Sequence, residues 1–151
     1  MGESMKIAVI DGQGGGIGRL IVEKLRQDLG HNCTILALGT NALAASVMLK
    51  AGANEGASGE NAIVFSSSRV DIITGSVAIL AANSYAGELT PRMAEAIASS
   101  DAVKILIPLN RSGIEICGTV DEPLPWQVDN LVDHVRRLYQ ERLAQDSSCF
   151  D

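Results

Sequence analysis

The sequence has few aromatic residues, no paired cysteines and no basic cluster, and each shortage excludes a class of protein. Only 3% of the 151 residues are aromatic although 46% are hydrophobic, so the core must be built from Ala, Val, Ile and Leu. Cys33, Cys117 and Cys149 form no CxxC pair, and neither His stands at metal-ligand spacing. This pattern suggests neither a disulfide framework nor a zinc site, so we expect no metal and a reducing cytoplasm as the location.

Charge and hydropathy argue against two further kinds of partner. Twelve Lys and Arg against 18 Asp and Glu give a net charge of −6, which suits neither nucleic acid nor an anionic membrane surface. No apolar run reaches the roughly 18 residues of a membrane helix, and residues 1–4 are too short and polar for a signal peptide. The length predicts a single domain over residues 1–144, with a mobile tail at 145–151, where no pattern is visible.

The most informative stretch is DGQGGGIG at residues 11–18, between the apolar run 6–10 and a helical pattern. Its five glycines cost backbone entropy that a simple connection does not need. A loop without side chains lets an anion reach the free N–H groups at a helix N-terminus. We therefore expect the loop to bind a nucleotide or another phosphate-bearing small molecule; the alternative is that the glycines only permit close packing of strand and helix. The candidate residues of the loop are Asp11, Gly12, Gln13, Gly14, Gly15, Gly16, Ile17 and Gly18.

The spacing of the glycines distinguishes between the known nucleotide loops. The patterns GxGxxG and GxxxxGK[ST] both fail, whereas GxxxGxG fits with Gly12, Gly16 and Gly18 in register. The loop thus resembles that of short-chain dehydrogenases, which implies that these glycines would lie against the pyrophosphate of NAD(P). That family's Tyr-x-x-x-Lys pair is absent from the chain. The acidic residue expected after the second strand to bind the ribose is also missing, because Thr40 and Asn41 stand there. Either one of these two binds the ribose or the ligand is not a dinucleotide.

A second resemblance extends over nearly the whole chain. The segments that carry it are MKIAVIDGQGGGIG, ALGTNALA, MLKAGANEGASGENAI, ANSYAGELTPRMAEAI and KILIPLNRSGIEICG. They resemble a family of small bacterial proteins of uncharacterised function with a Rossmann-like fold. This resemblance implies the fold and a ligand pocket but no reaction.

The pattern of apolar runs predicts an α/β protein with a single doubly wound, mostly parallel sheet of about five strands. Strands are expected at 6–10, 34–38, 70–74 and 103–109, with helices following them. Residues 114–120 are expected to add an antiparallel strand at an edge, because the connection at 110–113 is too short for a parallel crossover. Residues 53–61 are expected to form a loop, and 77–82 a helix capped by Ser76.

The carboxyl ends of the strands should meet at one edge of the sheet and form a pocket there. Arg111 is the best cationic candidate, since its planar fork binds a phosphate or carboxylate in two places, the alternative being an exposed turn arginine. Asp11 is expected to accept hydrogen bonds from loop amides rather than to hold Mg²⁺. The segment from Asn83 to Glu88 is polar and either faces a substrate or packs on a partner. Besides the loop, the edge should bring together Thr40, Asn41, Gly75, Ser76, Asn110 and Arg111.

Three functions fit these features. A binding module without chemistry is ranked first, because a domain this small usually borrows a second one to hold a substrate. An NAD(P)-dependent oxidoreductase lacking the Tyr and Lys pair, and a structural subunit with a vestigial loop, are the alternatives. A homo-oligomer, with a dimer favoured, is expected because helix 41–51 and the run 77–82 carry almost no charge and large apolar patches rarely stay exposed.

Overall fold

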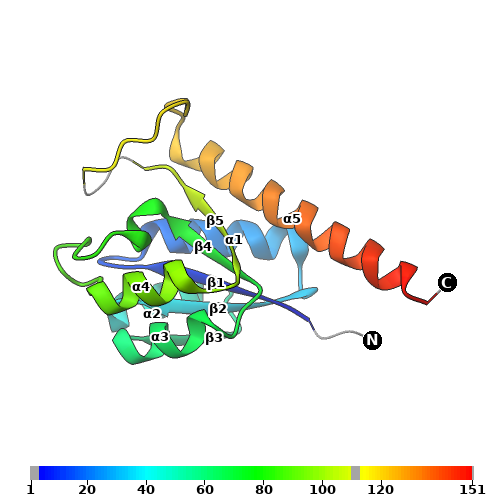
Figure 1. Ribbon diagram of the computed structural model, residues 1–151, viewed down its shortest axis with the longest axis horizontal. Helices are drawn as coiled ribbons and strands as arrows, with labels where there is room; N and C mark the ends of the chain where they lie inside the picture. The colour runs from blue at the N-terminus through cyan, green and yellow to red at the C-terminus, as the bar shows by residue number, and fades with distance from the viewer. Residues whose placement is uncertain (1–3, 110–112, 151) are drawn as a thin grey trace.

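The computed structural model describes residues 4–109 and 113–150, which form one parallel sheet with helices on both faces (Figure 1). The strand order is β3-β2-β1-β4-β5, so β1 is central. Doubly wound nucleotide-binding folds share this order, and the architecture fits the Rossmann-like class. The strands are β1 (Met5–Asp11), β2 (Cys33–Gly39), β3 (Glu55–Ser58), β4 (Ile72–Ser76) and β5 (Val103–Ile107).

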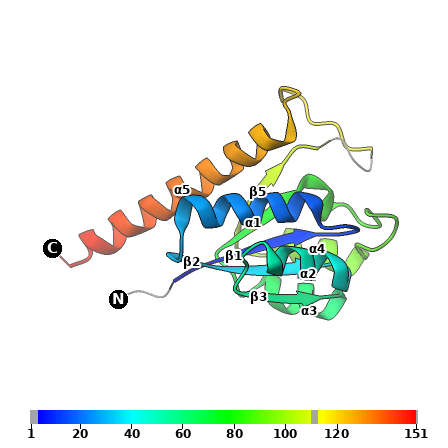
Figure 2. The ribbon, with the colours of Figure 1, turned by 180° about the vertical axis from the view of Figure 1, so that it is seen from behind.

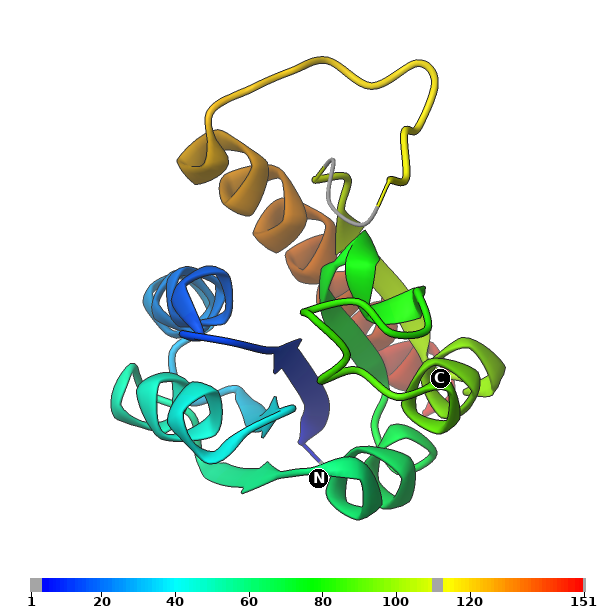
Figure 3. The same ribbon diagram turned by 90° about the vertical axis from the view of Figure 1, so that its left-hand side faces the viewer.

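Helices cover the sheet in two layers, which Figures 2 and 3 show from behind and from the end. Helices α1, α2 and α5 pack on one face, and α3, the short 3₁₀ helix η1 and α4 pack on the other. Along β1, Ile7 and Val9 face the first layer whereas Ala8 and Ile10 face the second, so the strand is buried on both sides and has no polar alternation. The helices are α1 (Gly16–Leu29), α2 (Ala42–Lys50), α3 (Glu60–Ser67), η1 (Val77–Leu80), α4 (Pro91–Ser99) and α5 (Leu124–Ser148).

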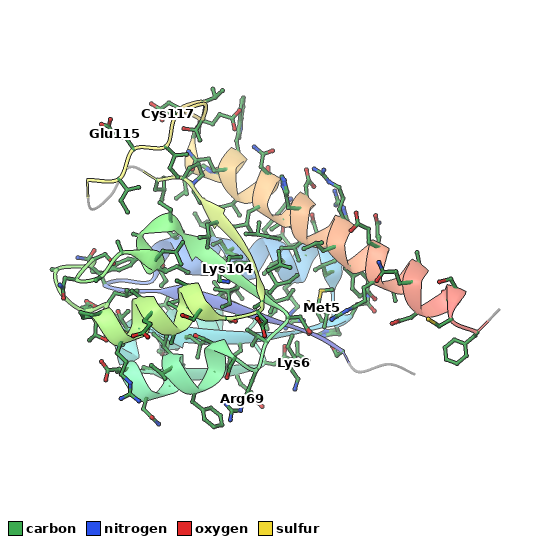
Figure 4. All side chains as sticks on the ribbon, in the orientation of Figure 1. Met5, Lys6, Arg69, Lys104, Glu115 and Cys117 are labelled. Atoms are coloured by element: carbon green, nitrogen blue, oxygen red, sulfur yellow. The ribbon has the colours of Figure 1, made fainter. Side chains whose placement is uncertain are left out.

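The prediction of an antiparallel edge strand is wrong. All strand pairs in the described part of the chain are parallel, and residues 114–120 form no strand. Gly113 and Gly118 have φ angles of 70° and 82°, which a strand does not accommodate. The segment carrying Glu115 and Cys117 is mostly exposed and lies away from the sheet (Figure 4). The apolar residues there resemble a strand in sequence, but no described strand pairs with them.

The strand at the other edge, β3, lies inside the region predicted to be a loop. Its sequence, EGAS, is too short and polar to show a strand pattern. The strand exists because it pairs with β2 from Leu36 and Glu55 through Gly39 and Ser58. Pairing with β2 therefore makes this segment a strand, although its local β-propensity is low.

Helix boundaries follow their caps. Asn41 caps α2 by accepting a hydrogen bond from the Ala44 amide at 2.8 Å, and Thr90 caps α4 with Pro91 at its first position. The helix predicted at 77–82 is one 3₁₀ turn, Val77–Leu80, with Ser76 as its cap. Helix α5 runs to Ser148, so residues 145–148 are helical rather than patternless. No helix in the described residues is long and apolar enough to cross a bilayer.

Candidate functional site

The glycine loop joins the central strand to the first helix at the carboxyl end of the sheet. Strand β1 ends at Asp11, and the turn closes when the Gly15 amide donates to the Gly12 carbonyl at 3.0 Å. Gly15 has a φ of 72°, a left-handed conformation that favours glycine, and α1 begins at the next residue. The N-terminus of α1 is thereby placed between β1 and β4, where the winding of the sheet reverses.

Asp11 holds this turn together. Its side chain is buried, with Oδ1 accepting from the Gly12 amide at 2.8 Å and Oδ2 from the Gly18 amide at 2.7 Å. The expectation that Asp11 accepts amide hydrogen bonds is confirmed. Its charge also lies at the positive end of α1, where it opposes a second anion. The amides of Gly14, Gly16 and Ile17 donate to no acceptor in residues 4–109 or 113–150.

Packing explains three of the five glycines. A Cβ on Gly12 would lie 2.7 Å from Thr40 Oγ1 and 2.9 Å from the Tyr85 ring, and one on Gly18 would overlap the Met48 side chain. Gly15 is fixed by its positive φ and by Ala44, whose Cα would stand 2.9 Å from a Cβ. The packing alternative therefore accounts for these positions without a ligand.

Gly14 and Gly16 are different, because packing does not require them to be glycine. A Cβ on either would meet no atom within 4 Å, and neither has a positive φ. Both line an open cavity of about 420 Å³, formed by residues 11–17 with Leu20 and Leu124. Its volume lies within the range of small-molecule sites. The cavity wall here consists of bare backbone with free amides, the surface that an anion can approach most closely.

A second polar cluster closes the β2 side of the loop, where Glu88 joins the predicted residues Thr40 and Asn41 to the loop. The segment between η1 and α4, residues 81–90, reaches the same end of the sheet as the glycine loop (Figures 1 and 2). There Glu88 Oε2 accepts from Thr40 Oγ1 at 2.8 Å, from Asn41 Nδ2 at 2.8 Å and from the Gln13 amide at 3.2 Å. Asn41 Nδ2 also donates to the Gln13 carbonyl at 3.0 Å.

The Glu88 carboxylate is stabilised in its charged form. Partial burial acts to raise the pKa of Glu88, but the hydrogen bonds from Asn41, Thr40 and the Gln13 amide outweigh it and hold the pKa below its usual value. The segment that carries it is rigidly folded, because the Asn83 amide donates to the Leu89 carbonyl at 2.7 Å and Leu89 is fully buried. The sequence indicated both parts of this cluster, because Thr40 and Asn41 were expected at the carboxyl edge and the run from Asn83 to Glu88 was expected to face a substrate or a partner. It did not indicate that Glu88 contacts residues 40 and 41.

The remaining predicted residues divide into two groups. Gly75 lies where β4 approaches β1 closely, since a Cβ there would stand 2.7 Å from the Ile10 carbonyl oxygen. Ser76 is buried and accepts from the Ala78 amide at 3.2 Å. Both therefore have packing and capping roles, and neither lines the glycine-loop cavity. Asn110 and Arg111 lie outside the described residues. Among the residues that are described, no three His, Cys, Asp or Glu side chains are grouped to hold a metal ion.

These features define the class: an α/β protein with one parallel sheet, in which a glycine turn after the central strand presents a helix N-terminus where the winding reverses. The chain belongs to the family described as Domain of unknown function (DUF3842), whose model matches residues 6–140. The match includes the glycine loop and all five strands except Met5, the first residue of β1. It confirms the predicted membership in a family of uncharacterised function. No curated protein and no solved structure gave a significant match.

Proposed function

We propose that this protein is a nucleotide-binding module of the cytoplasm, in which the loop from Gly12 to Gly18 receives the phosphate of a nucleotide or another phosphate-bearing small molecule. One observation carries the proposal: Gly14 and Gly16 are glycine although the fold leaves room for a side chain at both. A ligand pressed against the backbone explains this, because a Cβ would stand where its phosphate lies.

The available interactions suit a phosphate of moderate affinity. Each amide hydrogen bond to a charged oxygen contributes roughly 1.5–3 kcal/mol. The available donors are the amides of Gly14, Gly16 and Ile17, which have no acceptor within residues 4–109 and 113–150. The Asp11 charge at the same helix end reduces the gain, and no Lys or Arg of the described chain lines the cavity. Arg111, predicted to grip the anion from the β5 side, would supply the missing cation.

Binding without catalysis is the form of the proposal that the side chains favour. The Tyr and Lys pair of the short-chain dehydrogenases has no counterpart, and the Tyr85 ring is packed against Gly12 instead of facing a substrate space. The exposed Cys117 and Cys149 are free thiols, as a reducing cytoplasm allows. NAD(P) and simple nucleotides are both candidates for the ligand.

The test compares a glycine that lines the cavity with one that does not. Wild type, Gly16→Val and Gly56→Val are titrated calorimetrically with ADP, NAD⁺ and inorganic pyrophosphate up to millimolar concentration. Gly56 is the control, because it lies on β3 and its Cβ would meet only ordinary contacts at 3.5 Å and beyond. We expect Gly16→Val to lose binding by tenfold or more, about the effect of one charge-assisted contact. Failure of the wild type to bind any of the three, or full affinity in Gly16→Val, would contradict the proposal.

A homo-oligomer stays a prediction, and two apolar surfaces are candidates for its interface. On helix 41–51, which motivated it, Ala44, Ala45 and Met48 are buried within the protomer, whereas Leu43 is 62% exposed. The larger apolar surface is a groove of about 700 Å³ between the edge strand β5 and α5, with Val120 74% exposed at its rim. An unpaired apolar edge strand favours pairing with a second copy of the chain. Light scattering at micromolar concentration should therefore show a dimer, and a monomer would refute this.

A further inference from the structure

We propose that Glu88 supplies the carboxylate that binds the ribose of the nucleotide, in place of the acid that is missing after β2. The inference rests on the proposed function and adds the nucleoside to it. In dinucleotide-binding folds an acidic side chain following the second strand accepts a hydrogen bond from the ribose 2′-hydroxyl. In this chain Thr40 and Asn41 occupy that stretch, and the carboxylate comes to it from a segment 48 residues further along.

The position of the Glu88 carboxylate supports a role in ribose binding. Glu88 bonds the first two residues after β2 and also the Gln13 amide of the glycine loop. It therefore lies between the phosphate loop and the end of β2, the interval that a ribose spans when its phosphate is at the loop. Three contacts from two loops fix it there before any ligand arrives, and such pre-organisation reduces the entropy lost on binding.

The Glu88 carboxylate also keeps acceptor capacity for a ligand. A carboxylate offers about four lone-pair sites on two oxygens. Oε2 takes three donors, whereas the contact of Oε1 is to Asn41 Nδ2 at 3.2 Å, an atom that already donates to Oε2 at 2.8 Å. Oε1 therefore has room for a hydroxyl. The side chain is only partly buried, so the hydroxyl can reach it.

The arrangement also predicts which nucleotides are rejected. A 2′-phosphate would replace the hydroxyl by a second anion beside the Glu88 charge. Within the described residues, Arg19 pairs with Glu23 and Arg92 pairs with Glu60, so neither is directed at the cluster. We therefore expect NAD⁺ to bind more tightly than NADP⁺, and ribonucleotides more tightly than 2′-deoxyribonucleotides.

The test titrates wild type, Glu88→Gln, Glu88→Asp and Glu95→Gln with ADP, 2′-deoxy-ADP, NAD⁺, NADP⁺ and pyrophosphate, with thermal melts to check folding. Glu95→Gln is the matched control, because Glu95 is exposed on α4 and the charge change is the same. We expect wild type to prefer ADP over 2′-deoxy-ADP about tenfold, the worth of a hydrogen bond to a charged group. Glu88→Gln should lose that preference but still bind pyrophosphate, which has no ribose. If Glu88→Gln does not fold, Glu88→Asp replaces it in the test, because the shorter side chain withdraws the carboxylate by one methylene.

Each contrary result has a distinct meaning. Equal binding of ADP and 2′-deoxy-ADP by wild type would overturn the role of Glu88 in ribose binding. If pyrophosphate still bound in that case, the phosphate site would stand. Tighter binding by Glu88→Gln would show that the carboxylate occupies the ligand's place and must leave it, which also overturns the proposal. If wild type binds neither pyrophosphate nor any nucleotide, the phosphate site itself is refuted and the ribose role with it.

Discussion

Replacing Gly16 by alanine should stabilise the fold and weaken ligand binding in the same molecule. Gly16 is the first residue of α1, has no positive φ, and a Cβ there would have no neighbour within 4 Å. Where the backbone accepts alanine, a Gly→Ala change stabilises by about 0.4–1 kcal/mol, chiefly because the unfolded chain loses freedom. For a domain of this size that corresponds to a rise of roughly 1–4 °C in the midpoint of thermal unfolding.

The effect on binding has the opposite sign because the added methyl group projects into the cavity that the phosphate would enter. Loss of one charge-assisted amide contact, roughly 1.5–3 kcal/mol, corresponds to about 10- to 100-fold in affinity. Gly18→Ala is the matched control. Its Cβ would overlap the Met48 side chain and stand 3.0 Å from Asp11 Cβ, so it should destabilise the fold by about 1–3 kcal/mol.

The assay combines thermal and urea unfolding, followed by circular dichroism, with calorimetric titration of ADP. An unfolding free energy for Gly16→Ala more than about 1 kcal/mol below wild type would show that the space around Gly16 is not open. A stabilised Gly16→Ala that binds ADP as tightly as wild type would show that no ligand approaches this glycine. Either outcome refutes the reasoning.

Two further predictions concern the carboxylates that hold the fold together. Asp11→Ala removes two charge-assisted bonds to the glycine loop and should lower the free energy of unfolding by about 3 kcal/mol or more; a loss below about 1 kcal/mol in urea unfolding would mean that Asp11 does not order the turn. Asp71 accepts from the Lys6 amide at 2.8 Å and from Arg142 at 3.1 Å, which joins β1 to the far end of α5. Partial burial acts to raise the pKa of Asp71, but Arg142 and the Lys6 amide hold it below its usual value. This stabilisation is therefore fully present above the unfolded-state pKa and is lost as the pH falls through the lowered folded-state pKa. Urea unfolding between pH 7 and pH 3 should show a shallower acid decline for Asp71→Asn than for wild type, and identical slopes would exclude Asp71 as a contributor.

The sequence predicted the elements whose cause is local or whose burial is complete. Strand β1 is apolar from Ile7 to Ile10 because helices cover both of its faces there. Asn41 and Thr90 cap their helices through neighbours three residues away. The edge strand β3 was missed because its pairing with β2, and not its own sequence EGAS, makes it a strand. Residues 114–120 were misassigned because apolar residues were given more weight than the glycines at 113 and 118.

At the site, the loop was predictable but the division of its glycines was not. Whether a Cβ fits at Gly12, Gly15 or Gly18 depends on Thr40, Ala44 and Met48, which only the folded chain brings near. The contacts of Glu88 were not predicted for the same reason, since its hydrogen-bond donors at residues 13, 40 and 41 are 75, 48 and 47 positions away in the sequence. The role of Arg111 stays a prediction, because it lies outside the described residues.

The most direct test of the phosphate site is an amide chemical-shift titration of ¹⁵N-labelled protein with ADP. We expect the amides of Gly14, Gly16 and Ile17, which have no acceptor in the described chain, to shift most and to saturate together. Gly16→Val should abolish these shifts. Saturable shifts confined to another surface, such as the groove between β5 and α5, or no shifts at millimolar ADP, would contradict it.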